Sequence, residues 1–147
     1  MSEQNKALAR RAIDEVWNQG KLNVIDELTA ATATFHDANV PGGKFTGPEG
    51  LKQFVQIYRN AFPDVRLTIN DQIAEGDKVV TRWTATGTHK GQLMAIAPTN
   101  KHATVTGVDI DRYLDGKVVE AWASYDMFGM LQQLGVVPAM APAGVSA

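Results

Sequence analysis

The chain has 147 residues, with 14 Lys and Arg against 16 Asp and Glu, so its formal net charge is −2. Because this charge is close to zero and no dense basic segment is present, we do not expect nucleic acid as a partner. Cysteine is absent, which excludes disulfide bonds, thiolate metal sites and cysteine nucleophiles.

The length suits one domain, which we expect over residues 1–137, followed by a flexible tail over 138–147. The polar first residues lack the apolar core of a secretory signal. The longest apolar stretch follows Gly135, but it is interrupted by proline and glycine and is far shorter than the ~20 residues of a membrane-spanning helix. These features predict a cytoplasmic protein with no membrane partner.

The first part of the chain shows helical periodicity. Apolar residues recur at helical spacing over residues 5–19, and Gly20 follows as a stop. Asn23 can cap a short second helix, and a short strand is expected over 34–37. Pro48 suits the first turn of a third helix, whose broad apolar face contains Leu51, Phe54, Val55, Tyr58 and Phe62.

From Val65 onward polar and apolar residues alternate, which predicts strands over 65–75, 78–89, 103–114 and 118–126. Asp115-Gly116 predicts a type I′ turn between the last two strands, and a short helix is expected over 127–134. Helices followed by antiparallel strands indicate an α+β fold. Because only a strongly curved sheet can wrap the long aromatic helix face, we expect a cone with an internal cavity.

The two-residue turn predicts which side chains of the last two strands share a face. Residues paired symmetrically about the turn place Asp109 opposite Trp122 and Val105 opposite Asp126. The first face would then carry Val105, Gly107, Asp109, Asp111, Tyr113, Val118, Glu120, Trp122, Ser124 and Asp126. The opposite face would be apolar, with Val108, Ile110, Val119, Ala121, Ala123 and Tyr125.

Two interpretations of the first face remain open. It can face solvent, with its carboxylates as ordinary surface charges, or it can line the cavity, with Asp109 and Asp126 as acid/base groups. In the cavity, the two aspartates would disfavour double ionisation, and at least one would have a raised pKa. The apolar face needs a cover, and a second subunit is the simplest one, so we predict a homodimer or higher homo-oligomer.

Several short motifs resemble those of the SnoaL-like polyketide cyclases, which belong to the nuclear-transport-factor-2-like (NTF2-like) superfamily of cone-shaped α+β folds. The resemblance covers about residues 5 to 138. Its motifs are Gly47-Pro48-Glu49-Gly50, Phe62-Pro63-Asp64, Gly76-Asp77-Lys78-Val79-Val80, Gly87-Thr88-His89-Lys90-Gly91, Pro98-Thr99-Asn100-Lys101, Asp115-Gly116-Lys117 with Glu120-Ala121-Trp122 and Asp126, and Gln132-Gln133-Leu134-Gly135.

The resemblance implies roles for particular residues. The acid/base aspartate of the cyclases falls on Asp126. Their cavity histidine falls on Asp109, and a cavity asparagine falls on His36, so this chain departs from the family pattern at both positions. Further candidate substrate-binding residues are Trp122, Phe54, Tyr58, Phe62 and His89. His89 would be either a polar group at the cavity entrance or a residue that shapes a loop.

The first functional hypothesis is a cofactor-independent enzyme that closes a ring by an aldol reaction in an apolar, carbonyl-bearing, polyketide-like molecule. Asp126 would be the general base, and Asp109 and His36 would hold and polarise the substrate oxygens. A second is epoxide hydrolysis or isomerisation, in which Arg82 would link two aspartates. A third is a non-catalytic binding or dimerisation domain. The three histidines show no paired ligand spacing, and no phosphate or dinucleotide motif is present, so no metal or cofactor is expected.

Overall fold

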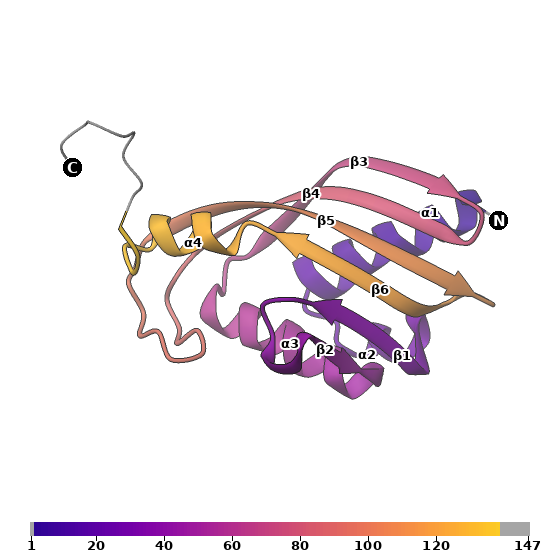
Figure 1. Cartoon of the computed structure of the whole chain (residues 1–147), viewed down its shortest axis with the longest axis horizontal. Helices are drawn as coiled ribbons and strands as arrows, with labels where there is room; N and C mark the ends of the chain where they lie inside the picture. Colours follow the sequence, from indigo (N-terminus) through magenta and orange to yellow (C-terminus); the bar gives the residue numbers. More distant parts are fainter. Residues whose placement is uncertain (1, 139–147) are drawn as a thin grey trace.

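The computed structural model describes residues 2–138, which form a six-stranded mixed sheet with helices packed on one face (Figure 1). The strand order is β2-β1-β6-β5-β4-β3, and only β1 and β6 pair in parallel. The strands are β1 (Thr29–Asp37), β2 (Lys44–Thr46), β3 (Arg66–Glu75), β4 (Lys78–Thr88), β5 (His102–Leu114) and β6 (Lys117–Tyr125). The curled sheet wrapped around helices confirms the predicted α+β cone.

The helices are α1 (Ser2–Arg11), α2 (Asn23–Leu28), α3 (Gly47–Ala61) and α4 (Met127–Gln133). Helix α1 continues as a π-helical segment, Ala12–Asn18. Helices α1 and α3 lie under the sheet, and α4 lies at one end of it (Figure 1). Helix α3 begins at Gly47 and carries Pro48 in its first turn, as predicted, where the fixed φ of proline suits the helix. None of these helices, over residues 2–138, is long and apolar enough to cross a membrane.

The structure extends one predicted strand, β1, and adds two short elements, a 3₁₀ turn and strand β2. Strand β1 begins at Thr29, earlier than expected, because its first residues pair with β6 far along the chain. Proline and glycine predict a loop over residues 40–44, where the structure has a 3₁₀ turn at Pro41–Gly43 followed by the short strand β2 from Lys44. Of the predicted tail over 138–147, all but Pro138 lies outside the described residues.

The Asp115-Gly116 turn forms as predicted, with both residues at positive φ, but the pairing beyond it differs. Tyr113 pairs with Val118 as expected, whereas Arg112 pairs with Glu120, which leaves Val119 as an extra residue on β6. This bulge turns the rest of β6 over. The predicted pairing of Asp109 with Trp122 is therefore wrong.

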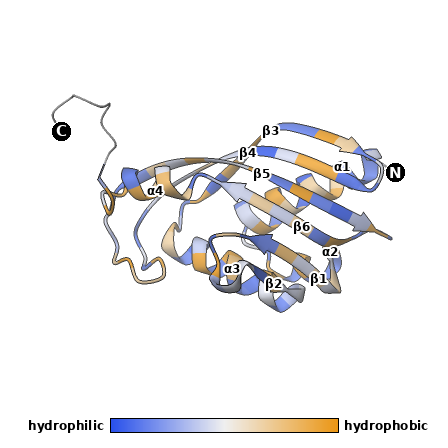
Figure 2. Ribbon diagram, in the orientation of Figure 1, coloured by the Kyte–Doolittle hydropathy of each residue, from blue (hydrophilic) through white to orange (hydrophobic). Residues whose placement is uncertain are grey.

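The bulge changes the composition of both faces of β6. Asp109 pairs with Ala123, so Ala121, Ala123 and Tyr125 face the helices, and not the outer face as predicted. Glu120, Trp122 and Ser124 take the outer face in their place, beside Val108 and Ile110. Figure 2 shows the alternation of polar and apolar residues along the strands that makes the two faces differ.

Candidate functional site

A cavity of about 200 Å³ lies between the helices and the concave face of the sheet. Its helix side is aromatic and aliphatic: Trp17 packs edge-on against Phe54, and Phe54 packs against Tyr58. Phe62 also lines the cavity and is buried. The three aromatic residues selected from the sequence, Phe54 and Tyr58 on α3 and Phe62 directly after it, thus form one wall of the pocket.

The sheet side of the cavity is hollow because small residues occupy its middle. Across the strands, Thr81, Asp109, Ala123 and Asp37 pair in one row that lines the cavity. In the next row Trp83 and Tyr125 flank Gly107, with ring centroids 6.2 Å apart.

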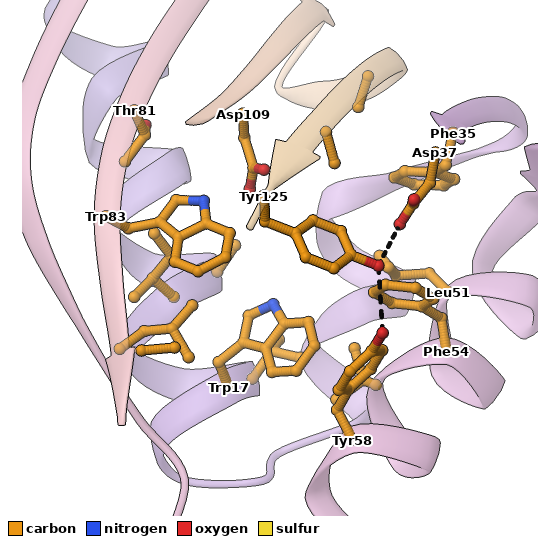
Figure 3. A pocket seen from close by; sticks show the side chains of 18 of the residues that line it. Trp17, Phe35, Asp37, Leu51, Phe54, Tyr58, Thr81, Trp83, Asp109 and Tyr125 are labelled. Carbon is orange, nitrogen blue, oxygen red and sulfur yellow. Dashed lines mark hydrogen bonds between the residues drawn. The ribbon is translucent and has the colours of Figure 1, made fainter. Parts of the chain in front are cut away.

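Neighbouring strands lie ≈ 4.7–4.9 Å apart. The backbone positions that carry the two carboxylates of the first row are therefore roughly 10 Å apart, with Ala123 between them in the row. The side chain of Tyr125 reaches from the next row into the space between Asp109 and Asp37, where its hydroxyl bonds to Asp37 (Figure 3).

Asp109 lies beside the indole of Trp83, and both line the cavity (Figure 3). The pKa of Asp109 is raised to about 6: burial is the main cause, the nearby Trp83 N–H opposes it, and the charge of Asp37 adds a smaller increase. A carboxyl group with a pKa near 6 can both accept and return a proton at neutral pH. The direction of this shift agrees with the raised pKa expected for a cavity aspartate.

Asp111 is the neighbour that couples to Asp109. It lies two residues along β5, on the same face, and lines the cavity. Burial raises the pKa of Asp111 well above its ordinary value, and the charge of Asp109 adds to this effect. The pair therefore disfavours double ionisation, as predicted for two cavity aspartates, but the partner of Asp109 is Asp111 and not Asp126.

A hydrogen-bonded chain crosses the opposite side of the cavity (Figure 3). The Tyr125 hydroxyl donates to Asp37 over 2.9 Å, and Asp37, which is 3% exposed, also accepts from the Asn39 amide over 2.8 Å. Because the Tyr125 proton points to a carboxylate, the Tyr58 hydroxyl, 3.1 Å away, donates to Tyr125. Burial raises the pKa of both tyrosines, so both stay protonated.

Removing the Tyr125 hydroxyl tests this chain. Tyr125→Phe leaves the buried Asp37 carboxylate with fewer donors, so we expect a loss of about 1–3 kcal/mol in the free energy of unfolding. Tyr58→Phe should lower the free energy of unfolding by less, because Tyr125 still donates its hydrogen bond to Asp37. Urea denaturation of both variants at pH 7 measures the difference, and equal losses would contradict the chain order.

His36 and Trp122, predicted as substrate-binding residues, border the cavity but alternate with its inward-facing residues. Their side chains therefore lie on the outer face of the sheet. There the two rings stack with their centroids 5.5 Å apart, and Nε2 of His36 lies 2.8 Å from the Glu120 carboxylate. Lys78 lies 5.8 Å from the Trp122 ring. Neither side chain joins Asp109.

Asp126, the acid/base residue implied by the resemblance, lies outside the cavity lining. It is exposed and is the N-cap of α4, where its carboxylate accepts the Gly129 amide over 2.9 Å. The predicted placement of Asp126 on the same face as Asp109 is thus wrong, because the bulge at Val119 turns β6 over before it.

His89 is fully buried and lies outside the cavity lining, so it is not an entrance residue. Its Nδ1 accepts the Thr99 amide over 3.2 Å, and its backbone amide donates to the Lys101 carbonyl over 2.9 Å. Its ring packs against the ring of Phe62, and the two ring centroids are 5.4 Å apart. The structure therefore supports the loop-shaping alternative for His89.

Arg82 is exposed and alternates with the inward Thr81 and Trp83, so it cannot link two cavity aspartates. Within the described residues, no group of three or more His, Asp or Glu side chains is arranged to hold a metal ion.

Asp37, Tyr125 and Trp83 also line the cavity, and none of them was predicted there from the sequence. Asp37 could have been found, since it alternates with the apolar Ala33 and Phe35 on β1. Tyr125 was assigned to the wrong face because of the bulge.

Comparison with known proteins identifies the family of this chain. Residues 7–134 match the family described as SnoaL-like polyketide cyclase. The nogalonic acid methyl ester cyclase of Streptomyces nogalater is 28% identical over 120 residues, covering 81% of this chain and 89% of the relative.

Two solved structures of Streptomyces proteins also resemble this chain. AclR, a candidate hydroxylase from Streptomyces galilaeus, superposes with a TM-score of 0.83 at 27% identity, covering 97% of this chain and 87% of that one. IdmH, a candidate polyketide cyclase from Streptomyces antibioticus, superposes with a TM-score of 0.78 at 34% identity, covering 90% of this chain and 99% of that one. On its fold and on a match across nearly its whole length, the chain belongs to the SnoaL-like polyketide cyclase family.

Proposed function

We propose that this protein is a cofactor-independent cyclase that uses Asp109 as its general acid/base on a carbonyl-bearing polyketide. The observation that carries the proposal is a carboxyl group with a pKa of about 6 in a cavity otherwise lined mainly by apolar and aromatic side chains. Such a group can remove a proton from a carbon flanked by carbonyls, because that proton is already acidic. The family supports a cyclase-type enzyme.

The proposed reaction needs only one proton carrier. The Asp109 carboxylate removes the proton, and the electrons of the C–H bond form an enolate. The enolate carbon attacks a second carbonyl carbon of the same molecule, which forms a C–C bond and an alkoxide. Protonated Asp109 then returns its proton to the alkoxide. The product is an isomer of the substrate, so no oxidant is consumed.

The cavity size supports a substrate that is enclosed only in part. At about 200 Å³ it is smaller than the roughly 300–1,000 Å³ of ordinary small-molecule pockets. We therefore expect the reacting ring of a polycyclic molecule to enter between Asp109 and Tyr125, with its remainder nearer the surface.

The first test is conversion of nogalonic acid methyl ester, the substrate named for the Streptomyces nogalater relative, followed by chromatography and mass spectrometry. We expect a product of unchanged mass. A panel of related polycyclic ketoesters in D₂O extends the test, because a general base exchanges the acidic proton for deuterium even where ring closure fails. No exchange and no product across the panel would contradict the proposal and favour a binding domain.

The pH dependence of the reaction is a separate prediction. Because the carboxylate form is the base, kcat/KM should rise with pH through about 6 and then stay level. A profile measured from pH 4.5 to 8.5 checks this, and a flat profile would exclude Asp109 as the base.

We also propose a homodimer that forms through the outer face of the sheet. Val80, Ile110 and Trp122 make an apolar row there. Lys78 and Glu120 beside the row supply opposite charges that a second copy could match. Light scattering should give twice the mass of one chain, and Val108→Glu, an exposed position on that face, should give the single-chain mass. A monomeric wild type would contradict the proposal.

A further inference from the structure

The indole nitrogen of Trp83 is a buried donor that the reaction described above does not use. Trp83 lies on β4, lines the cavity and is only 8% exposed. Its Nε1 is buried and has no hydrogen-bond partner among the described residues. An indole N–H can only donate, and a buried donor without an acceptor is costly and rare in folded proteins. The position of this atom therefore points to an acceptor that enters the cavity.

The orientation of the indole is possible because residue 107 is glycine. Trp83 and Gly107 pair across β4 and β5, and a Cβ atom at Gly107 would overlap Cζ2 and lie 2.7 Å from Cη2 of the indole. Only glycine lets the six-membered ring lie across β5, with Nε1 turned toward Asp109 (Figure 3). The ring of Tyr125, 6.2 Å away between centroids, packs on this arrangement.

The Trp83 N–H lies near the Asp109 carboxyl without bonding to it. It is close enough to lower the pKa of Asp109. It does not reach hydrogen-bonding geometry with that carboxyl. A base and an unused donor therefore border the same part of the cavity. A substrate with an acidic C–H next to a carbonyl needs this combination, because its proton and its oxygen lie on adjacent carbon atoms.

We propose that the Trp83 Nε1–H donates a hydrogen bond to the carbonyl oxygen of the substrate, next to the carbon that Asp109 deprotonates. The inference rests on the proposed function and adds the group that holds the enolate oxygen. The indole keeps its proton throughout. Because negative charge grows on that oxygen as the C–H bond breaks, the bond strengthens in the transition state and lowers the barrier.

The first experiment reads the indole proton directly. The chain has three tryptophans, so nitrogen-15 NMR gives three indole signals, with Trp17 in the cavity wall and Trp122 on the outer face as references. The added ligand is 2-naphthol, a flat molecule whose oxygen resembles that of an enolate. We expect the Trp83 indole proton to move downfield, as a new hydrogen bond requires.

Two outcomes of the titration would overturn the proposal. One is binding of 2-naphthol, seen at Trp17, while the Trp83 indole proton stays unmoved or moves upfield by ring current. The other is no response from either cavity tryptophan at millimolar ligand. Neither result depends on turnover, so the titration decides the role of Trp83 even if no substrate is converted.

The second experiment removes one N–H group and little else. Trp83 is replaced by its benzothiophene analogue, in which sulfur stands in place of N–H. We expect about tenfold weaker binding of 2-naphthol, or roughly 1.4 kcal/mol. We also expect a plateau kcat lower by about 10²–10³, with KM little changed. Because the N–H has no hydrogen-bond partner in the folded chain, the melting temperature should not fall at pH 4.5, where Asp109 carries its proton.

A role limited to tuning Asp109 gives a different pattern. In that case the analogue would move the inflection of the pH profile upward but leave the plateau kcat and the 2-naphthol affinity unchanged, and the proposal would be wrong. If wild-type protein binds 2-naphthol through Trp83 but neither converts substrate nor exchanges its protons, the cyclase proposal fails while the donor assignment stands.

Discussion

Asp109→Asn is expected to abolish turnover and, at pH 8, to make the protein more stable. Asparagine keeps the shape of the side chain but cannot take up the substrate proton, so kcat should fall by about 10³. The gain in stability follows from the position of the carboxyl. Its pKa is raised from 3.8 to about 6 in the folded chain, so ionising it weakens the fold as the pH rises through that window.

The size of the gain depends on pH. Two units of raised pKa correspond to about 3 kcal/mol at full effect, and the partial exposure of Asp109 reduces this to an expected 1–3 kcal/mol at pH 8. At pH 4, where Asp109 carries its proton in the folded chain, the variant and wild type should differ little. Urea denaturation at both pH values gives the comparison.

Two further variants make the result specific. Asp71→Asn applies the same chemical change at an exposed position of β3 and should alter neither turnover nor the pH dependence of stability. Asp126→Asn keeps the helix cap, since asparagine caps as well as aspartate. If turnover is lost with Asp126→Asn and kept with Asp109→Asn, the base is the residue implied by the family resemblance and our assignment is wrong.

Gly107→Ala is expected to cost about 3 kcal/mol in the free energy of unfolding and to reduce turnover strongly. The added methyl group would overlap the six-membered ring of Trp83, and a well-packed indole can yield only by leaving its rotamer. Moving the ring also moves Nε1 away from Asp109. Thermal and urea denaturation measure the first effect, and the kcat of the variant measures the second.

The steric cause can be separated from a general intolerance of alanine. Gly107→Ala combined with Trp83→Phe should be more stable than Gly107→Ala alone, because the smaller ring leaves room for the methyl group. Turnover should stay low, since the N–H is gone. Gly50→Ala in α3 is the matched control: its Cβ would meet Phe45 at 3.4 Å, and alanine favours helix, so stability should hold or rise. Equal losses for both glycines would contradict the explanation.

Signals carried by neighbouring residues were sufficient to predict most elements of this fold, except β2 and the beginning of β1. Pro48 marks the start of α3, and Asp115-Gly116 marks the hairpin turn, because each residue restricts its own backbone. Alternation predicted β3 to β6 to within about two residues at each end. The order of helices before strands then led to the α+β cone, and Asp109 and Asp111 were correctly placed on one face of β5.

Only the tertiary structure decided which side chains of β6 and β1 meet Asp109. The extra residue at Val119 is set by the twist and packing of paired strands, which no local pattern records, and it exchanges Trp122 for Tyr125 in the cavity. Asp37 reaches the same row because β1 pairs in parallel with β6, over 80 residues later in the chain. The sequence by itself therefore determined most elements and one acidic face, whereas the site required long-range pairing, in which a shift of one residue inverts a strand.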